Sequence, residues 1–412
     1  MVAVLLVQKF GGTSVADPDR IRAVADHVAR TRREGDDVVV VVSAMGKSTD
    51  DLLRLARDVS DHPEGRELDM LLTAGERISM ALVCMAVESL GVPAVSFTGS
   101  QAGIVTDTEH GRAKIIEVRG DRIREALADG KVAIVAGFQG VSTEREITTM
   151  GRGASDLTAV ALAAALGADV CEIYTDVEGV YTADPRVVPQ ARKLQRVSFD
   201  EMLEMAATGG RVLALRSVEF ARNHHVRVHV RSSFTWAPGT WITEEEDPSM
   251  TSMEQAIISG VTHDASEAKV TIEQVPDRPG VAATWFRALA DAGVNVDMIV
   301  QNVSTAGRTD ISFTVPRADL SRAETCMDKI VVETEATGYR TDERIGRISL
   351  VGAGMRTHPG VAARMFEVFA SEGINIEMIS TSTIRVSCVV AEDDVERGVR
   401  ALHSAFGLDG AS

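Results

Sequence analysis

A short apolar run passes directly into a lysine and two glycines in Val4-Leu5-Leu6-Val7-Gln8-Lys9-Phe10-Gly11-Gly12-Thr13-Ser14. The run is long enough for a buried strand and too short to span a membrane. Glycines let backbone N–H groups approach a ligand closely, because they have no Cβ. The Walker A spacing is absent, since Lys9 precedes the glycines. The stretch predicts a strand and a phosphate-binding loop, and an ordinary strand–turn–helix with a surface lysine is the alternative.

The composition is that of an ordinary globular protein. The 412 residues are 45% apolar and 25% charged, which favours two or three domains. A net charge of −17 argues against a nucleic-acid or anionic-membrane partner. No apolar run reaches spanning length and no cationic head precedes one at the N-terminus. Four scattered cysteines without metal-ligand spacing favour reduced thiols, so we expect a cytoplasmic protein without a metal cluster.

Strand-like and helix-like stretches alternate from the start to about residue 232. Val38–Val42, Val132–Ala136 and Val170–Tyr174 are apolar enough for strands buried on both faces. An alanine-rich helix is expected over Ala159–Leu166, before Gly167. This alternation predicts an α/β fold, with a mostly parallel sheet sandwiched by helices. Ligands of such sheets bind at the C-terminal ends of the strands.

The C-terminal half contains an internal repeat. Pro279–Phe286 recurs as Pro359–Phe366, and Gly293–Ile299 recurs as Gly373–Ile379, both with an offset of 80 residues. Each unit has the pattern strand, turn, helix, strand, strand. A ligand-binding module is one interpretation, and a purely structural duplication is the other.

Six segments, taken in order, resemble the aspartate kinase family. They are Lys9–Ser14, Ser43–Gly46 with Thr49-Asp50, Ala74–Ser79, Phe97–Gly103, Gly151–Asp156 and Tyr174–Arg186. The repeats resemble ACT domains, which are small α+β modules of ferredoxin-like βαββαβ topology that bind amino acids. The resemblance covers almost the whole chain. It implies an amino-acid-kinase domain at 1–233, a linker at 234–262, and ACT repeats at 263–342 and 343–412.

The resemblance implies ATP- and Mg²⁺-dependent phosphorylation of the β-carboxylate of L-aspartate to 4-phospho-L-aspartate. This is the first step of the lysine, threonine and methionine pathway. The implied catalytic residues are Lys9, Arg152 and Asp156, and the implied substrate-binding residues are Thr49, Glu76, Arg152, Ser155 and Asp156. The implied ATP-binding residues are Lys9, Phe10, Gly11, Gly12, Ser43, Thr175, Asp176, Tyr181, Asp184, Arg186 and Arg211.

The resemblance also implies feedback by lysine and threonine at the ACT repeats, and a homo-oligomer formed through them. The implied effector-binding residues are Asp277, Asn295, Val296, Asp297, Gln301, Asn375, Ile376 and Thr381. Three positions depart from the family pattern, and they are Ala154, Arg211 and Thr383. A kinase acting on glutamate, a deregulated aspartate kinase and a catalytically weak amino-acid sensor are the alternatives.

Overall fold

The computed structural model describes residues 4–244, 258–302, 307–353, 355, 358 and 360–409. The chain divides into two compact units. The N-terminal unit runs to Val180 and continues through Lys193–Ala207 and from Arg211 onward. The C-terminal unit contains the repeats together with the short segments Tyr181–Arg192 and Thr208–Gly210. We describe each unit separately.

The N-terminal unit is built on an eight-stranded sheet in the order β10-β12-β11-β9-β1-β2-β6-β3. All its strand pairs are parallel except β11 with β12. The central strands are rich in β-branched residues because helices bury both faces. The strands are β1 Leu5–Phe10, β2 Asp37–Val42, β3 Ala94–Phe97, β6 Val132–Ala136, β9 Val170–Thr175, β10 Arg196–Ser198, β11 Val228–Ser232 and β12 Thr240–Thr243. The predicted α/β fold is confirmed.

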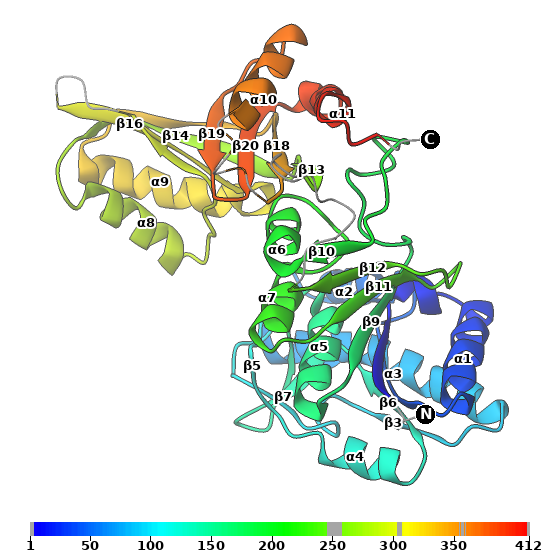
Figure 1. Cartoon of the computed structure of the whole chain (residues 1–412). Coiled ribbons are helices and arrows are strands. Elements are labelled where there is room, and N and C mark those ends of the chain that lie inside the picture. The colour runs from blue at the N-terminus through cyan, green and yellow to red at the C-terminus, as the bar shows by residue number, and fades with distance from the viewer. Residues whose placement is uncertain are drawn as a thin grey trace. The chain divides into compact units, whose positions relative to one another are not determined.

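Helices cover the two faces of this sheet (Figure 1). On one face, α1 (Pro18–Arg33) and α3 (Gly65–Ser89) share a core with alternate residues of the central strands. On the other face lie α5 (Ala154–Leu166) and α7 (Leu215–Asn223). The unit also contains the short helix η1 (Gly12–Val15), α2 (Ser48–Val59), α4 (Asp121–Ala128) and α6 (Phe199–Ala207).

A second, small sheet in this unit has the order β5-β4-β7-β8. Its strands are β4 Ile104–Thr106, β5 Ile115–Val118, β7 Gln139–Ser142 and β8 Ile147–Thr149. Strand β8 leads directly into the Gly151–Asp156 motif, so this sheet delivers that motif to the start of α5.

Helix α3 is long and apolar enough, by length and composition, to cross a membrane. Half of its most apolar window is buried within the unit, however. It also carries the buried side chains of Asp69 and Glu76, which are 1% and 3% exposed. We therefore interpret α3 as a core helix.

The C-terminal unit contains two four-stranded sheets, in the orders β15-β16-β14-β17 and β13-β18-β20-β19. The first has strands β14 Glu267–Pro276, β15 Ile299–Gln301, β16 Arg308–Pro316 and β17 Gly338–Asp342, with helices α8 Val281–Asp291 and α9 Leu320–Thr334. The second has β13 Gly260–Asp264, β18 Ile345–Val351, β19 Met378–Thr381 and β20 Arg385–Ala391, with α10 Gly360–Ser371 and α11 Val395–Ala405.

Two strands lie in or across the predicted linker at 234–262. Strand β12 lies between β10 and β11 in the eight-stranded sheet, and β13 pairs antiparallel with β18 of the second repeat. The second repeat therefore takes its edge strand from a segment that precedes the first repeat in the chain. Sequence similarity did not reveal this strand, because a repeat offset locates only what is duplicated.

The segment Tyr181–Arg192 is also part of the C-terminal unit. Its residues Ala183, Val187 and Val188 lie in the buried core of the second repeat. The Thr182 hydroxyl lies 2.9 Å from Nε2 of the buried His403 on α11. This segment is therefore held by the second repeat along most of its length.

Candidate functional site

The glycine loop lies at the C-terminal edge of the large sheet, between the ends of β2 and β9. Gly11 N–H donates to the Tyr174 carbonyl oxygen at 3.1 Å, and Ser43 N–H donates to the Phe10 carbonyl oxygen at 3.1 Å. A Cβ on Gly12 would lie 2.9 Å from the Ala44 carbonyl oxygen. The loops are thus packed too closely for any side chain at Gly12.

Lys9 and Asp156 form a buried ion pair beside this loop. Lys9 Nζ lies 2.6 Å from Asp156 Oδ1, and the two residues are only 9% and 7% exposed. Lys9 comes from β1 and Asp156 from the first turn of α5. The helix N-terminus and the ammonium group are both groups that can bind phosphate, and the Asp156 carboxylate holds the ammonium group in place.

The Gly151–Asp156 turn has the left-handed backbone at Gly153, where φ is +77°. A side chain there would also meet the Ala214 Cβ at 2.7 Å. Ala154 is the first residue of α5 and does not have positive φ. The departure from the family pattern at Ala154 therefore causes no backbone strain.

Glu76 projects from α3 toward the Ser43–Ala44 loop. Its Oε1 accepts a hydrogen bond from Ala44 N at 3.1 Å, while Oε2 is buried without a hydrogen-bond partner among the described residues. Burial raises the pKa of Glu76 to about 7. A buried carboxylate oxygen without a partner is costly unless a ligand pairs with it.

Arg152 lies on the exposed side of the same turn. One guanidinium nitrogen donates to Asp50 Oδ1 at 2.9 Å, which places Arg152 beside the first turn of α2, where Thr49 also lies. Ser155 is 7% exposed and occupies the space left by the absent side chain of Gly137. The structure therefore brings Arg152 next to Thr49, because Arg152 bonds to the neighbouring Asp50. Asp50 was not among the predicted site residues.

The predicted ATP-binding residues fall into two groups, one in the N-terminal unit and one in the C-terminal unit. Thr175 ends β9 and Asp176 follows it at the C-terminal edge of the sheet, and the Thr175 hydroxyl donates to Asp176 Oδ1 at 3.1 Å. The Phe10 ring is buried and stacks on Tyr174 at 4.8 Å, so only the backbone of Phe10 faces the loop. Arg211 is exposed between α6 and α7.

Tyr181, Asp184 and Arg186 belong to the segment that is part of the C-terminal unit. The Arg186 guanidinium donates to both carboxylate oxygens of Asp184. This bonding lowers the pKa of Asp184. Their role in ATP binding remains a prediction.

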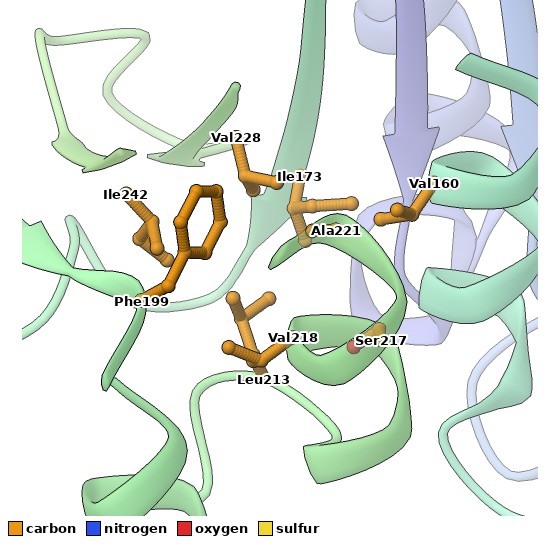
Figure 2. Close-up of a pocket in the computed structure, with 9 residues that line it drawn as sticks. All are labelled: Val160, Ile173, Phe199, Leu213, Ser217, Val218, Ala221, Val228 and Ile242. Carbon is orange, nitrogen blue, oxygen red and sulfur yellow. The ribbon is translucent and has the colours of Figure 1, made fainter. Parts of the chain in front are cut away.

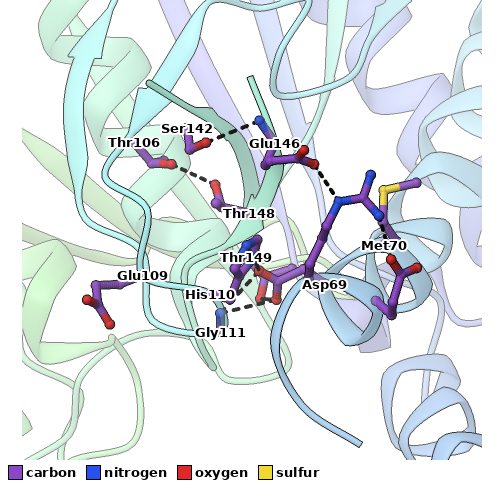
Figure 3. A network of polar contacts seen from close by, with 12 residues as sticks. Asp69, Met70, Thr106, Glu109, His110, Gly111, Ser142, Glu146, Thr148 and Thr149 are labelled. Atoms are coloured by element: carbon purple, nitrogen blue, oxygen red, sulfur yellow. Dashed lines mark hydrogen bonds and ion pairs between the residues drawn. The ribbon is translucent and has the colours of Figure 1, made fainter. Parts of the chain in front are cut away.

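A buried carboxylate supports the turn that carries Arg152, and sequence analysis missed it (Figure 3). Asp69 of α3 accepts hydrogen bonds from the Thr149 amide and hydroxyl and from the Gly111 amide, and it lies 2.7 Å from His110 Nδ1. Arg216 donates to the Met150 carbonyl oxygen at 2.9 Å. Both contacts fix the end of β8 just before Gly151.

An apolar gap between the sheet and α7 is part of the core. Figure 2 shows its lining, which is apolar except for Ser217. The gap leaves no room for a water molecule. It carries no chemistry and serves to pack α7 against the strands.

The first repeat contains a cavity of about 320 Å³ at the turn between β14 and α8. Asp277 and Gln301, two predicted effector-binding residues, line it together with the Pro279-Gly280 turn. The corresponding turn of the second repeat includes Pro359, which lies outside the described residues.

The other predicted effector residues lie elsewhere. Asp297 pairs with Arg347 of the second repeat, and the corresponding Glu377 pairs with Lys269 of the first. Each repeat thus reaches across to the other with the same acidic position. Asn295, Val296, Asn375 and Ile376 occupy the matching segments before β15 and β19, and Thr381 ends β19.

Comparisons with known proteins identify the family of the chain and its domains. Residues 4–232 match the amino acid kinase family, and residues 270–329 and 348–406 match the ACT domain. The chain is 57% identical to the aspartokinase of Mycobacterium tuberculosis and 56% identical to that of Corynebacterium efficiens. Each match runs over 411 residues, or 98% of this chain and 97% of the relative.

Solved structures give the same result. E. coli aspartokinase III in complex with aspartate and ADP is 26% identical, with a TM-score of 0.82, over 98% of this chain and all of that one. The same enzyme with lysine and aspartate gives a TM-score of 0.72 over 97% of this chain and 99% of that one. With its amino-acid-kinase domain and two ACT repeats, the chain belongs to the aspartokinase family.

Proposed function

We propose that this aspartate kinase transfers the γ-phosphoryl group of ATP to the β-carboxylate of L-aspartate, forming 4-phospho-L-aspartate and ADP. The observation that carries the proposal is the buried Lys9–Asp156 pair beside the Gly11-Gly12 loop. A fixed cation beside a glycine loop, whose backbone a ligand can approach closely, suits a transferring phosphoryl group.

Aspartate would be held by its two other charged groups. Glu76 Oε2 is suited to the α-ammonium group, because it is buried and has no partner among the described residues. Arg152 presents a planar guanidinium to the α-carboxylate, with Thr49 and Ser155 nearby. This use of Glu76 favours an amino-acid substrate over a simple carboxylic acid.

The reaction needs no general base, because the β-carboxylate is ionised at neutral pH. One of its oxygens forms a bond to the γ-phosphorus while the bond from that phosphorus to the bridging oxygen of ADP breaks. Lys9 neutralises charge that develops on the phosphoryl oxygens. Asp156 holds the Lys9 ammonium group in position.

Mg²⁺ would supply further charge neutralisation on the phosphates. Among the residues the structure describes, no group of three His, Cys, Asp or Glu side chains could hold a metal ion. A Mg²⁺ ion that arrives with the nucleotide would keep phosphate and water oxygens as most of its ligands.

We further propose that lysine and threonine regulate the enzyme through the ACT repeats. The cavity beside Asp277 and Gln301 has room for an amino acid, and the E. coli relative was solved with lysine. We expect a cytoplasmic homo-oligomer that serves the lysine, threonine and methionine pathway. Two alternatives to a regulated enzyme are a deregulated aspartate kinase and a catalytically weak amino-acid sensor.

The test is an ATP-dependent assay in which hydroxylamine traps the acyl phosphate. L-Aspartate is compared with L-glutamate, each with and without lysine plus threonine. Hydroxamate formed only from aspartate, and reduced by the effectors, is the expected result. Activity that ignores the effectors would support the deregulated enzyme, and no hydroxamate from either acid would overturn the kinase proposal.

A further inference from the structure

Ser233 connects three segments of the nucleotide side of the site. It follows the end of β11 and is 4% exposed. The Ser14 hydroxyl donates to the Ser233 hydroxyl at 2.8 Å. The Ser233 hydroxyl and amide both donate to the Thr175 carbonyl oxygen, at 3.2 and 3.0 Å. One side chain therefore links the glycine loop to the ends of β9 and β11.

The loop after Ser233 is itself held by a buried charge pair. Arg231 donates to the Trp236 carbonyl oxygen at 2.8 Å and to Glu172 at 2.9 Å. Bonds from neighbouring side chains hold the pKa of Glu172 near 2 despite its burial. The Trp236 ring stacks on His27 of α1 at 4.2 Å. The base on which Ser233 rests is thus rigid.

Ser14 is the point at which this support reaches the glycine loop. It lies in the short helix η1, is 1% exposed, and its amide donates to the Gly11 carbonyl oxygen at 2.9 Å. A displacement of Ser14 would therefore also move Gly11 and Gly12. Backbone N–H groups bind phosphate well only when their directions are fixed in advance.

We propose that Ser233 is a positioning residue for nucleotide binding, which holds the Gly11-Gly12 loop in its phosphate-binding geometry through Ser14. The proposal rests on the proposed function, in which this loop takes the phosphates of ATP. Ser233 has no contact with the substrate in this role. It acts only through the position of the loop.

The test combines Ser233→Ala, Ser14→Ala and the double variant. Each single variant should raise the KM for ATP and the Kd for ADP about fivefold, which corresponds to the loss of one buried hydrogen bond. The KM for aspartate should stay unchanged. The double variant should be no worse than Ser233→Ala, because Ser233→Ala already removes the Ser14–Ser233 bond together with the bond from the Ser233 hydroxyl to the Thr175 carbonyl oxygen.

A matched control comes from the C-terminal unit. Ser349 and Ser387 form another buried hydroxyl pair at 2.7 Å, and Ser349→Ala should leave the Kd for ADP unchanged. ADP binding is measured by calorimetry, so the result does not depend on which acid is phosphorylated. Unchanged nucleotide affinity in both single variants, or additive losses in the double variant, would overturn the proposal. If Ser233→Ala does not fold, Ser14→Ala decides alone.

Discussion

Lys9 is the residue on which the proposed chemistry depends most. Lys9→Ala would leave Asp156 without its cation and the phosphoryl oxygens without theirs. We expect kcat to fall by about 10³-fold, as when other transition-state charge partners are removed. Trapped hydroxamate measures the loss, and circular dichroism checks that the fold is retained.

The control for this change is Lys131→Ala. Lys131 is a half-exposed lysine that pairs with Asp129 in the same unit, away from the glycine loop. Its removal should leave kcat unaffected. Activity of Lys9→Ala within a few-fold of the wild type would refute the assignment of the phosphate site.

Glu76 should make aspartate binding depend on pH. Its pKa is raised to about 7 by burial, and only the ionised form can pair with an ammonium group. The KM for aspartate should therefore rise as the pH falls from 8 to 6. In Glu76→Gln the KM should be high and nearly independent of pH, and a parallel pH profile in both proteins would rule out this role.

The same pKa predicts an effect on stability with a definite sign. The folded protein binds this proton more tightly than the unfolded chain, in which a glutamate has its ordinary pKa of 4.5. Ionisation of Glu76 therefore destabilises the fold by about 3 kcal/mol once the pH exceeds about 7. Glu76→Gln should melt at a higher temperature than the wild type at pH 8 and at a similar temperature at pH 5. Scanning calorimetry at both values tests this.

At the scale of single elements, Asp69 connects α3 to the end of β8. In Asp69→Asn, one carboxylate oxygen that accepts hydrogen bonds is replaced by an amide NH₂ group that donates them. This NH₂ group would face the Gly111 and Thr149 amides and the Thr149 hydroxyl, which are themselves donors. We expect the free energy of unfolding to fall by about 2–4 kcal/mol. The KM for aspartate should also rise, because the turn that carries Arg152 loses its anchor.

Urea unfolding and steady-state kinetics measure these two effects. Asp129→Asn removes an exposed carboxylate of the same unit and should change neither quantity by much. A stable Asp69→Asn with normal aspartate kinetics would show that the Arg216 contact alone fixes the turn.

The predicted elements were those with a local pattern. The continuous β-branched run Val38–Val42 predicted β2, the apolar run Val132–Ala136 predicted β6, and the lysine beside two glycines predicted a loop after β1. Asp69 and Ser233 have no such pattern, since each is a single polar residue whose partners are distant in sequence. The family resemblance implied Asp297 as an effector ligand, and a carboxylate suits a cationic amino acid, but only the structure shows that this carboxylate pairs with Arg347. A charge pattern does not reveal its partner.

At the scale of the whole C-terminal unit, Arg347 joins the first repeat to the second. It is 2% exposed and pairs with Glu267 at 3.0 Å and with Asp297. Burial raises the pKa of Glu267, so this carboxylate already lies in an unfavourable environment. Arg347→Met would leave the carboxylates unpaired, and we expect a loss of about 3–5 kcal/mol.

For Arg347→Met, calorimetry should show a lower melting temperature of the C-terminal unit. Inhibition of the kinase activity by lysine should also be weaker. Basal aspartate kinase activity should persist. Arg340→Met removes an exposed arginine of the same unit, which pairs with Glu273, and should behave like the wild type. An unchanged melting profile for Arg347→Met would mean that apolar packing alone joins the repeats.

Strand β13 has a consequence for how the protein is made. It leaves the ribosome before the first repeat, but its partner β18 is synthesised only after that repeat is complete. The pairing of β13 with β18 therefore closes a long loop that contains the whole first repeat. Closing this loop is slow because its two ends are distant in sequence. An amino-terminal fragment that stops after the first repeat would expose β13 as an unpaired edge prone to aggregation.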